Sequence, residues 1–151
     1  MRILVSGASG FIGSSLIKYL RSNSSIEIFC ISRSEVSLNE SLSQYKNIHF
    51  FSCDLTESFI EWPKHYEKFD AVINFASQQP TNKNITEQDF YETNIKCLTN
   101  LWKQSLRRGM SHFIHFSSTS VYPQNYSLIS VDESSETGPV NAYGRSKLMS
   151  E

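Results

Sequence analysis

A tyrosine and a lysine in the last part of the chain are the residues best suited to proton chemistry. Tyr143 and Lys147 stand four positions apart at the start of an expected helix, so both side chains lie on one helical face. A free phenol ionises at about pH 10. An ammonium about 4 Å away favours the phenolate by up to about 4 kcal/mol at an effective dielectric of about 20. Such a tyrosine can exchange protons at neutral pH, although an ordinary helical pair remains the alternative.

A run of hydroxyl side chains precedes this pair. Residues 117–120 read Ser-Ser-Thr-Ser and follow an expected strand at 112–116. Their hydroxyls therefore emerge at the carboxyl edge of the sheet. A hydroxyl in that position can donate a hydrogen bond to a substrate oxygen on which negative charge develops.

The first twenty residues predict an anion site that would face these groups. A short apolar strand at 2–5 is followed, from Phe11 onward, by apolar residues at helical spacing. The glycines between them leave backbone N–H groups free at the start of the helix, where the helix dipole also favours an anion such as a pyrophosphate. The Gly-Lys-Ser/Thr ending of nucleoside-triphosphate loops is absent, which argues against an ATPase or GTPase. A turn without a ligand is the alternative; the expected cofactor contacts are Gly7, Ser9, Gly10, Phe11, Ile12 and Gly13.

The end of the second expected strand, at 26–31, bears on which dinucleotide binds. In dinucleotide folds an acidic residue here holds the free ribose 2′-hydroxyl, whereas an arginine suits a 2′-phosphate. This chain has Ser32 and Arg33. A guanidinium binds phosphate through paired, charge-assisted hydrogen bonds, so we expect NADP, with NAD still possible. The alternative is that Arg33 is a solvated loop residue, because Glu35 follows closely.

Strands and helices alternate along the chain. Further strands are expected at 48–52, 70–74 and 112–116, with a long helix at 87–108 that Gly109 ends and weaker helices at 38–45 and 56–67. This order predicts right-handed βαβ units and an α/β fold: one domain, 1–151, with a Rossmann-like, doubly wound parallel sheet that binds ligands at the carboxyl ends of its strands.

Composition narrows the class of partner. The 151 residues include 14 basic and 15 acidic side chains and no basic block, which argues against nucleic-acid and polybasic membrane partners and favours a small molecule. Three scattered cysteines suit reduced thiols, and no apolar run is long enough for a signal peptide or a membrane span, so we expect a cytoplasmic protein. His112 and His115 point to opposite faces of a strand, and we interpret them as structural rather than metal-binding.

The motifs together resemble the extended branch of the short-chain dehydrogenase/reductase superfamily, in the nucleotide-sugar epimerase and dehydratase group. The resemblance lies in Gly-Ala-Ser-Gly-Phe-Ile-Gly, Asp54-Leu55, Asn-Phe-Ala-Ser at 74–77, Ser-Ser-x-x-Val-Tyr at 117–122 and Tyr-x-x-x-Lys at 143–147, in that order. It implies that Asp54 and Leu55 contact the adenine. It also implies that Phe75, Ala76 and Ser77 pass under the nicotinamide side of the cofactor, and that Asn94 shapes the active site.

The resemblance also implies catalytic roles. Ser118, three positions before Val121, would be the catalytic hydroxyl, with Thr119 as the second choice. Tyr143 would take a proton from a sugar hydroxyl while hydride leaves the same carbon for the nicotinamide. Lys147 would tune Tyr143 and hold the nicotinamide ribose. The expected substrate is a nucleotide sugar, and the resembled enzymes often form homodimers.

The resembled enzymes continue past Glu151 with further strands and a substrate domain. From the sequence we therefore expect the chain to be incomplete at its C-terminal end, and to bind NADP but turn over little substrate alone. A sensor or scaffold that binds NAD(P) without catalysis is the second interpretation. Retention of Ser118, Tyr143 and Lys147 favours the enzyme, because a sensor has no use for a proton-transfer set.

Overall fold

All five predicted strands are present and join into one parallel sheet. The computed structural model describes residues 1–33, 42, 44–57, 62–63, 68–81, 84–123 and 130–151. The sheet has the order β3-β2-β1-β4-β5, and every neighbouring pair is parallel. This is the order of a doubly wound, Rossmann-like sheet. The strands are β1 (Arg2–Ser6), β2 (Glu27–Ser32), β3 (Ile48–Ser52), β4 (Ala71–Asn74) and β5 (His112–His115).

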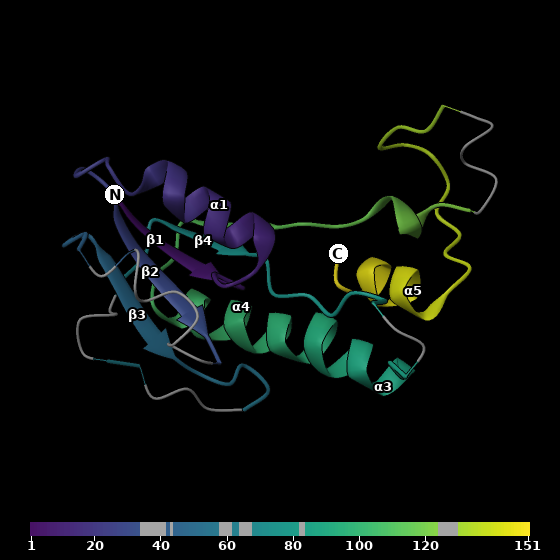
Figure 1. Cartoon of the computed structure of the whole chain (residues 1–151). Helices are drawn as coiled ribbons and strands as arrows, with labels where there is room; N and C mark the ends of the chain where they lie inside the picture. Colours follow the sequence, from purple (N-terminus) through teal and green to yellow (C-terminus); the bar gives the residue numbers. More distant parts are fainter. Residues whose placement is uncertain (34–41, 43, 58–61, 64–67, 82–83, 124–129) are drawn as a thin grey trace.

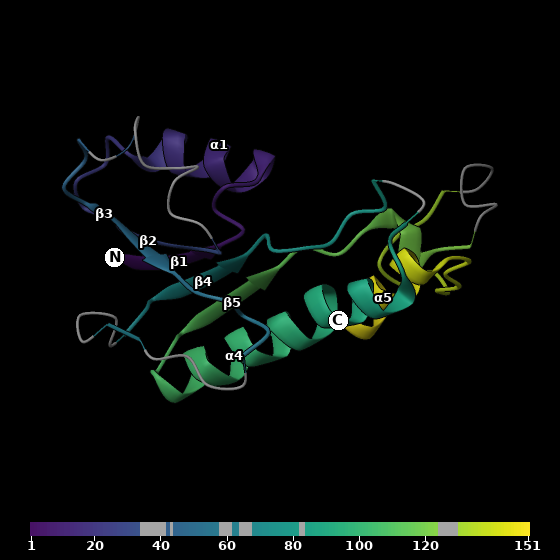
Figure 2. The same ribbon diagram turned by 60° about the horizontal axis from the view of Figure 1, so that its bottom comes forward.

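Helices cover both faces of the sheet. Figure 2 shows α1 (Phe11–Leu20) on one face and α4 (Leu98–Arg107) on the other. Side chains of β1 alternate between the faces: Ile3 and Val5 pack with Ile17 of α1, while Leu4 packs with Leu101 of α4. This alternation follows from the two-residue period of a strand, and burial on both faces explains why the central strands are almost continuously apolar.

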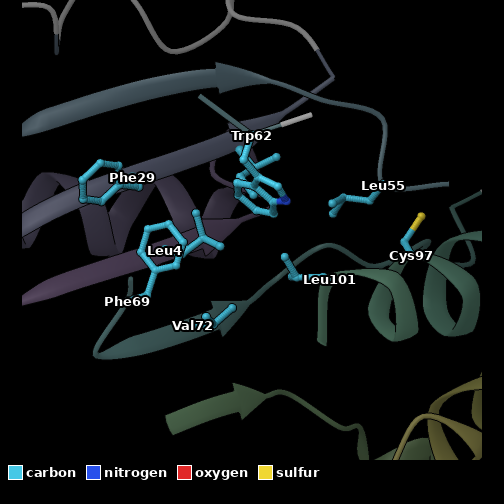
Figure 3. Close-up of a cluster of buried hydrophobic side chains, with 9 residues drawn as sticks. Leu4, Phe29, Leu55, Trp62, Phe69, Val72, Cys97 and Leu101 are labelled. Carbon is cyan, nitrogen blue, oxygen red and sulfur yellow. The ribbon is translucent and has the colours of Figure 1, made fainter. Parts of the chain in front are cut away.

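The cluster on the α4 side is rich in aromatic rings (Figure 3). Phe69 packs edge-on against Phe29, with ring centroids 5.4 Å apart, and lies 6.1 Å from Trp62. Leu101 of α4 is fully buried in the same cluster. Large rings fill the space between sheet and helix, so this face supplies much of the apolar area that holds α4 in place.

The predicted helix at 87–108 is one continuous helical path with an unexpected middle. It begins at α3 (Glu87–Phe90), passes through a π-helical segment, η1 (Tyr91–Cys97), and continues as α4. At its start, Thr86 and Asp89 form a reciprocal capping box. Gly109 ends the path, as expected, with a φ of 69° and its N–H donated to the Leu106 carbonyl.

The last helix, α5 (Ala142–Met149), docks beyond the carboxyl ends of β4 and β5 (Figure 2). It packs on the 3-10 turn η2 (Thr119–Val121) and on η1. A Cβ atom added at Gly144 would lie 2.2 Å from the Ser120 carbonyl oxygen. Only glycine permits this approach, so Gly144 decides how closely α5 can approach the hydroxyl run.

Most of the two weaker helices predicted at 38–45 and 56–67 lies outside the described residues. Within the described ranges, no helix combines the length and apolar character that crossing a bilayer requires.

Replacement of Leu101 by alanine tests the α4 packing. Leu101 is fully buried, whereas Leu106 on the same helix is 53% exposed. We expect Leu101→Ala to lower the free energy of unfolding by about 2–5 kcal/mol, because it leaves a cavity among rings. The matched control Leu106→Ala should change it by less than about 0.5 kcal/mol. Urea denaturation measures both, and equal losses would contradict the packing described.

Candidate functional site

A cleft opens at the carboxyl ends of β1, β2 and β4, by the turn that leads from β1 into α1. Figure 1 shows where that turn joins the two elements. The cleft lies where the sheet order reverses direction, with β2 on one side of β1 and β4 on the other. Its volume is about 250 Å³. Ten of the sixteen residues predicted to contact a cofactor line it: Gly7, Ser9, Gly10, Ser32, Arg33, Asp54, Leu55, Phe75, Ala76 and Ser77.

The three glycines of the first turn have different structural roles. Gly7 has a φ of 64°, and a Cβ there would lie 2.6 Å from the backbone of Phe75 and of Ala76. A Cβ on Gly13 would lie 2.4 Å from the Gly7 carbonyl oxygen. Gly7 and Gly13 therefore let β1, α1 and the loop after β4 meet at backbone distance, and Gly13 is buried rather than exposed to the cleft.

Gly10 instead faces the cleft. It is the N-cap of α1 and has no side chain with which to cap the first N–H groups of the helix. The first turn of α1 contains no acidic residue. The side chains of Phe11 and Ile12 are exposed and do not line the cleft, so any contact they make to an anion comes from their backbone N–H groups. The arrangement fits a pyrophosphate.

Two residues of opposite charge, Arg33 and Asp54, also line the cleft. The Asp54 carboxylate accepts a hydrogen bond of 2.9 Å from the Thr56 N–H. Hydrogen bonds from the Thr56 backbone and side chain, together with the Arg33 charge, lower the pKa of Asp54 below its usual value. Asp54 is therefore ionised at neutral pH. Arg33 and Asp54 together place a cation and a hydrogen-bond acceptor in the cleft, and their contacts to the ribose and adenine of a nucleotide stay predictions.

Asn94 ties the loop after β4 to α5. Its side chain is 1% exposed, and its oxygen accepts from the Gln78 N–H at 2.7 Å and from the Ser77 hydroxyl at 3.1 Å. Its amide nitrogen donates to the Ser146 hydroxyl at 2.8 Å. Asn94 lies in the π-helical segment, a feature often found at functional sites. Asn94 therefore joins these elements through direct contacts, and its role in shaping an active site stays a prediction.

The Lys147 side chain is buried against the residue that follows β5. It is 2% exposed, and its ammonium donates to the Phe116 carbonyl at 2.5 Å. Burial lowers the pKa of Lys147, with Glu151 acting in the opposite direction. Among the described residues no hydrogen bond joins Lys147 to Tyr143, and the predicted effect of the ammonium on the phenol stays a prediction. A buried ammonium requires an acceptor, and the exposed carbonyl after β5 provides one.

Ser118 and Tyr143 lie on neighbouring elements but outside the cleft lining. The Ser118 oxygen caps η2 by accepting from the Ser120 N–H at 3.2 Å. Tyr143 packs its ring 5.9 Å from that of Phe90. Among described residues its hydroxyl makes no hydrogen bond. The contact of Gly144 with Ser120 brings the helix of Tyr143 onto the turn of Ser118.

Sequence reasoning missed several residues of the site. Cys53, Thr56, Gln78, Thr93 and Cys97 also line the cleft. Each lies within a few positions of a predicted contact, and this proximity was the available signal. Burial is the largest influence on both cysteines and raises the pKa of Cys53 and of Cys97 to about 11, so both stay protonated thiols.

His115 contacts polar groups on two other segments of the chain. Its ring lies 3.1 Å from the Asn74 amide nitrogen, 3.0 Å from the Ser150 hydroxyl and 3.4 Å from the Lys147 ammonium. Burial, and then the Lys147 charge, lower the pKa of His115 to about 4. Within the described ranges no three His, Cys, Asp or Glu side chains are arranged to hold a metal.

Comparison with known proteins gives a consistent result. The sequence model of the "NAD dependent epimerase/dehydratase family" matches residues 3–151. A UDP-glucose 4-epimerase of Caenorhabditis elegans is 30% identical over the whole chain, which spans 48% of that relative. A dTDP-D-glucose 4,6-dehydratase of Mus musculus is 29% identical over 99% of the chain and 44% of its own length.

Solved structures agree. The UDP-glucuronic acid 4-epimerase of Bacillus cereus in complex with NAD superposes with a TM-score of 0.83 at 27% identity, over 99% of this chain and 50% of that one. The UDP-Glc/GlcNAc 4-epimerase of Campylobacter jejuni gives 0.80 at 31% identity, over 99% and 46%. The chain thus spans about half the length of the relatives it matches. On the family match across residues 3–151, this chain belongs to the NAD dependent epimerase/dehydratase family.

Proposed function

We propose that this chain is the dinucleotide-binding part of an enzyme that epimerises or dehydrates a nucleotide sugar with a nicotinamide cofactor. The observation that carries the proposal is the cleft above Gly10, where uncapped N–H groups of α1 face a space lined by ten predicted cofactor residues. Relatives named as UDP-glucose 4-epimerases and dTDP-glucose dehydratases support this substrate class.

In the proposed chemistry the chain's own residues handle the proton. Tyr143, as phenolate, removes the proton from a sugar hydroxyl, and the C–O bond becomes a carbonyl as hydride leaves the same carbon. The nicotinamide, when bound, supplies the hydride acceptor. Ser118 donates a hydrogen bond to the oxygen as its charge changes. In an epimerisation, Tyr143 would return the proton to the carbonyl oxygen when hydride is added back to the opposite face of that carbon.

Lys147 acts in this scheme as a fixed positive charge. An ammonium has three donors, and the Phe116 carbonyl accepts from one of them. A role in holding a cofactor ribose would use the remaining N–H groups of the ammonium, which lies 3.4 Å from His115 Nε2 in this structure.

We propose NADP as the preferred dinucleotide. Arg33 lines the cleft, and the residue that closes β2 is Ser32 rather than an acidic residue. The comparison structures are NAD complexes and lend no specific support to NADP. The preference therefore depends on Arg33 alone.

A Gly10→Ala variant tests the anion site. The new Cβ meets only the Gly7 carbonyl, at 3.2 Å, so the fold should tolerate it, but it intrudes where a diphosphate would approach the backbone. We expect affinity for NADPH and NADH to fall at least tenfold, measured by cofactor fluorescence. Ser15→Ala, on the exposed side of α1, is the control and should bind normally. Unchanged binding by Gly10→Ala would remove the pyrophosphate from this turn.

An Arg33→Ala variant tests the choice of dinucleotide. The native chain should bind NADPH more tightly than NADH, and the variant should lose about tenfold in NADPH affinity while NADH affinity stays the same, because only NADPH carries the 2′-phosphate. Lys18→Ala removes an equal charge from the far end of α1 and should leave both affinities unchanged. Equal binding of the two cofactors by the native chain would refute the preference.

A Tyr143→Phe variant tests catalysis. Measured on the protein at its natural length with a UDP- or dTDP-hexose, kcat should fall by about 10²–10⁴, because general-base assistance is lost, while cofactor affinity is preserved. Tyr19→Phe, which removes a hydroxyl that is far from the cleft, should retain full turnover. Retained activity in Tyr143→Phe would exclude its role, and absence of turnover in the native protein would favour a binding-only domain.

A further inference from the structure

Three polar residues form a row across neighbouring strands at the carboxyl edge of the sheet. Ser6, Asn74 and His115 end β1, β4 and β5, and the strand register places Ser6 beside Asn74 and Asn74 beside His115. Ser6 and Asn74 are almost fully buried. Buried polar groups are costly unless each is hydrogen-bonded, so a continuous row of them indicates a specific structural demand at this edge.

The hydrogen bonds of this row have one consistent direction. The Ser6 hydroxyl donates to the Asn74 side-chain oxygen. The Asn74 amide nitrogen, which can only donate, faces Nδ1 of His115 at 3.1 Å, so Nδ1 is the unprotonated nitrogen. The ring proton is therefore on Nε2, which faces the Ser150 oxygen at 3.0 Å. With this tautomer the Lys147 ammonium, 3.4 Å from Nε2, faces a donor and makes its hydrogen bond to the Phe116 carbonyl instead.

The row ends on the helix that carries the proposed catalytic residues. The Ser150 hydroxyl donates its own proton to the Lys147 carbonyl at 2.6 Å, which leaves its oxygen free to accept from His115. The Lys147 ammonium lies 3.4 Å from His115 Nε2 and donates to the carbonyl of Phe116, the residue after His115. The buried residues of α5 are Gly144, Ser146 and Lys147, with no large apolar side chain among them.

We propose that His115, held as the neutral Nε2–H tautomer by the Ser6–Asn74 row, is a positioning residue that docks the end of α5 and aims the Lys147 ammonium. This inference rests on the proposed function for its catalytic meaning, because Lys147 is the proposed charge beside the cofactor and Tyr143. The docking itself is independent of that function.

The charges around His115 explain why it must be neutral. From α5 and the residue after Ser150 it faces Lys147 and Glu151; from β4 it faces the uncharged Asn74. The α4 residues near it, Leu98, Thr99 and Trp102, are uncharged. A second proton would occupy Nδ1, opposite the donor nitrogen of Asn74, and would add a positive charge near Lys147. Protonation therefore breaks the row and repels the lysine.

The sign of the pH dependence follows from this arrangement. The pKa of His115 in the folded chain is lowered to about 4. An unfolded histidine titrates at about 6.5. The contribution of His115 to docking is therefore complete above the unfolded value and is lost as the pH falls from about 6.5 towards 4.

NMR tests the tautomer on the 151-residue chain without cofactor. Long-range 1H–15N spectra of histidine-labelled protein should show His115 as the Nε2–H tautomer, with a titration midpoint at least one pH unit below that of the exposed His112. An Nδ1–H tautomer, or a midpoint equal to that of His112, overturns the proposal. These spectra require no cofactor binding, so their outcome is separate from that of the Gly10→Ala test.

Substitutions test the positioning role. His115→Phe removes both ring nitrogens, and we expect the pKa of Lys147, followed in 13C-labelled lysine spectra, to rise towards that of a solvated lysine as α5 loosens. His115→Gln should preserve the low value, because its amide N–H can still donate to Ser150 and cannot titrate. Ser150→Ala interrupts the same link from the helix side and should shift Lys147 in the same direction as His115→Phe.

Because several variants are compared, the positioning role of His115 is tested even if one of them folds poorly. Unmoved Lys147 titration in His115→Phe and Ser150→Ala, or failure of His115→Gln to restore it, overturns the proposal. If dinucleotide binding is present, the native chain should lose affinity between pH 6 and 4, whereas His115→Gln should lose less. An identical pH profile for the two proteins would also count against His115.

Discussion

The close approach of three backbone segments at Gly7 is the constraint on which the rest of this structure depends. The end of β1, the start of α1 and the loop after β4 meet where side chains would overlap backbone atoms at 2.4–2.6 Å. Because no side chain stands between them, α1 begins directly beside the sheet edge, and its first N–H groups face the cleft. The cleft, its charge preference and the course of residues 75–77 all follow from this contact.

Polar contacts, rather than apolar packing, hold the second half of the site. Asn94 joins the loop after β4 to Ser146, and Lys147 reaches the carbonyl of Phe116. Each buried polar group is satisfied by a partner on another element, and loss of one partner would leave the other unpaired at a cost of about 1–3 kcal/mol. Hydrogen bonds have a preferred direction, whereas hydrophobic contacts have none, so this docking fixes the orientation of α5 more closely. It also makes the position of α5 sensitive to protonation of His115.

The two halves of the site are therefore held by different kinds of interaction. The anion cradle is built from backbone and glycine and does not titrate. The side that carries the proposed proton-transfer residues is held by the His115 imidazole, the buried Lys147 ammonium and the Asn94 amide. The helix from 87 to 107 joins them, since its π-helical segment carries Asn94 towards the loop, while Leu101 anchors α4 in the aromatic cluster (Figure 3).

The sequence by itself determined the strands, their parallel direction, the glycine turn and ten of the residues that line the cleft, because these depend on local periodicity and on the absence of side chains at fixed spacing. Tertiary structure alone decided where Lys147 points, because four-residue spacing places two side chains on one helical face but does not say which acceptor a buried ammonium will find. It also decided the role of His115, whose partners Ser6 and Asn74 are distant in sequence and meet it only through strand register. Interactions set by neighbouring residues could be predicted, and those set by the pairing of distant strands could not.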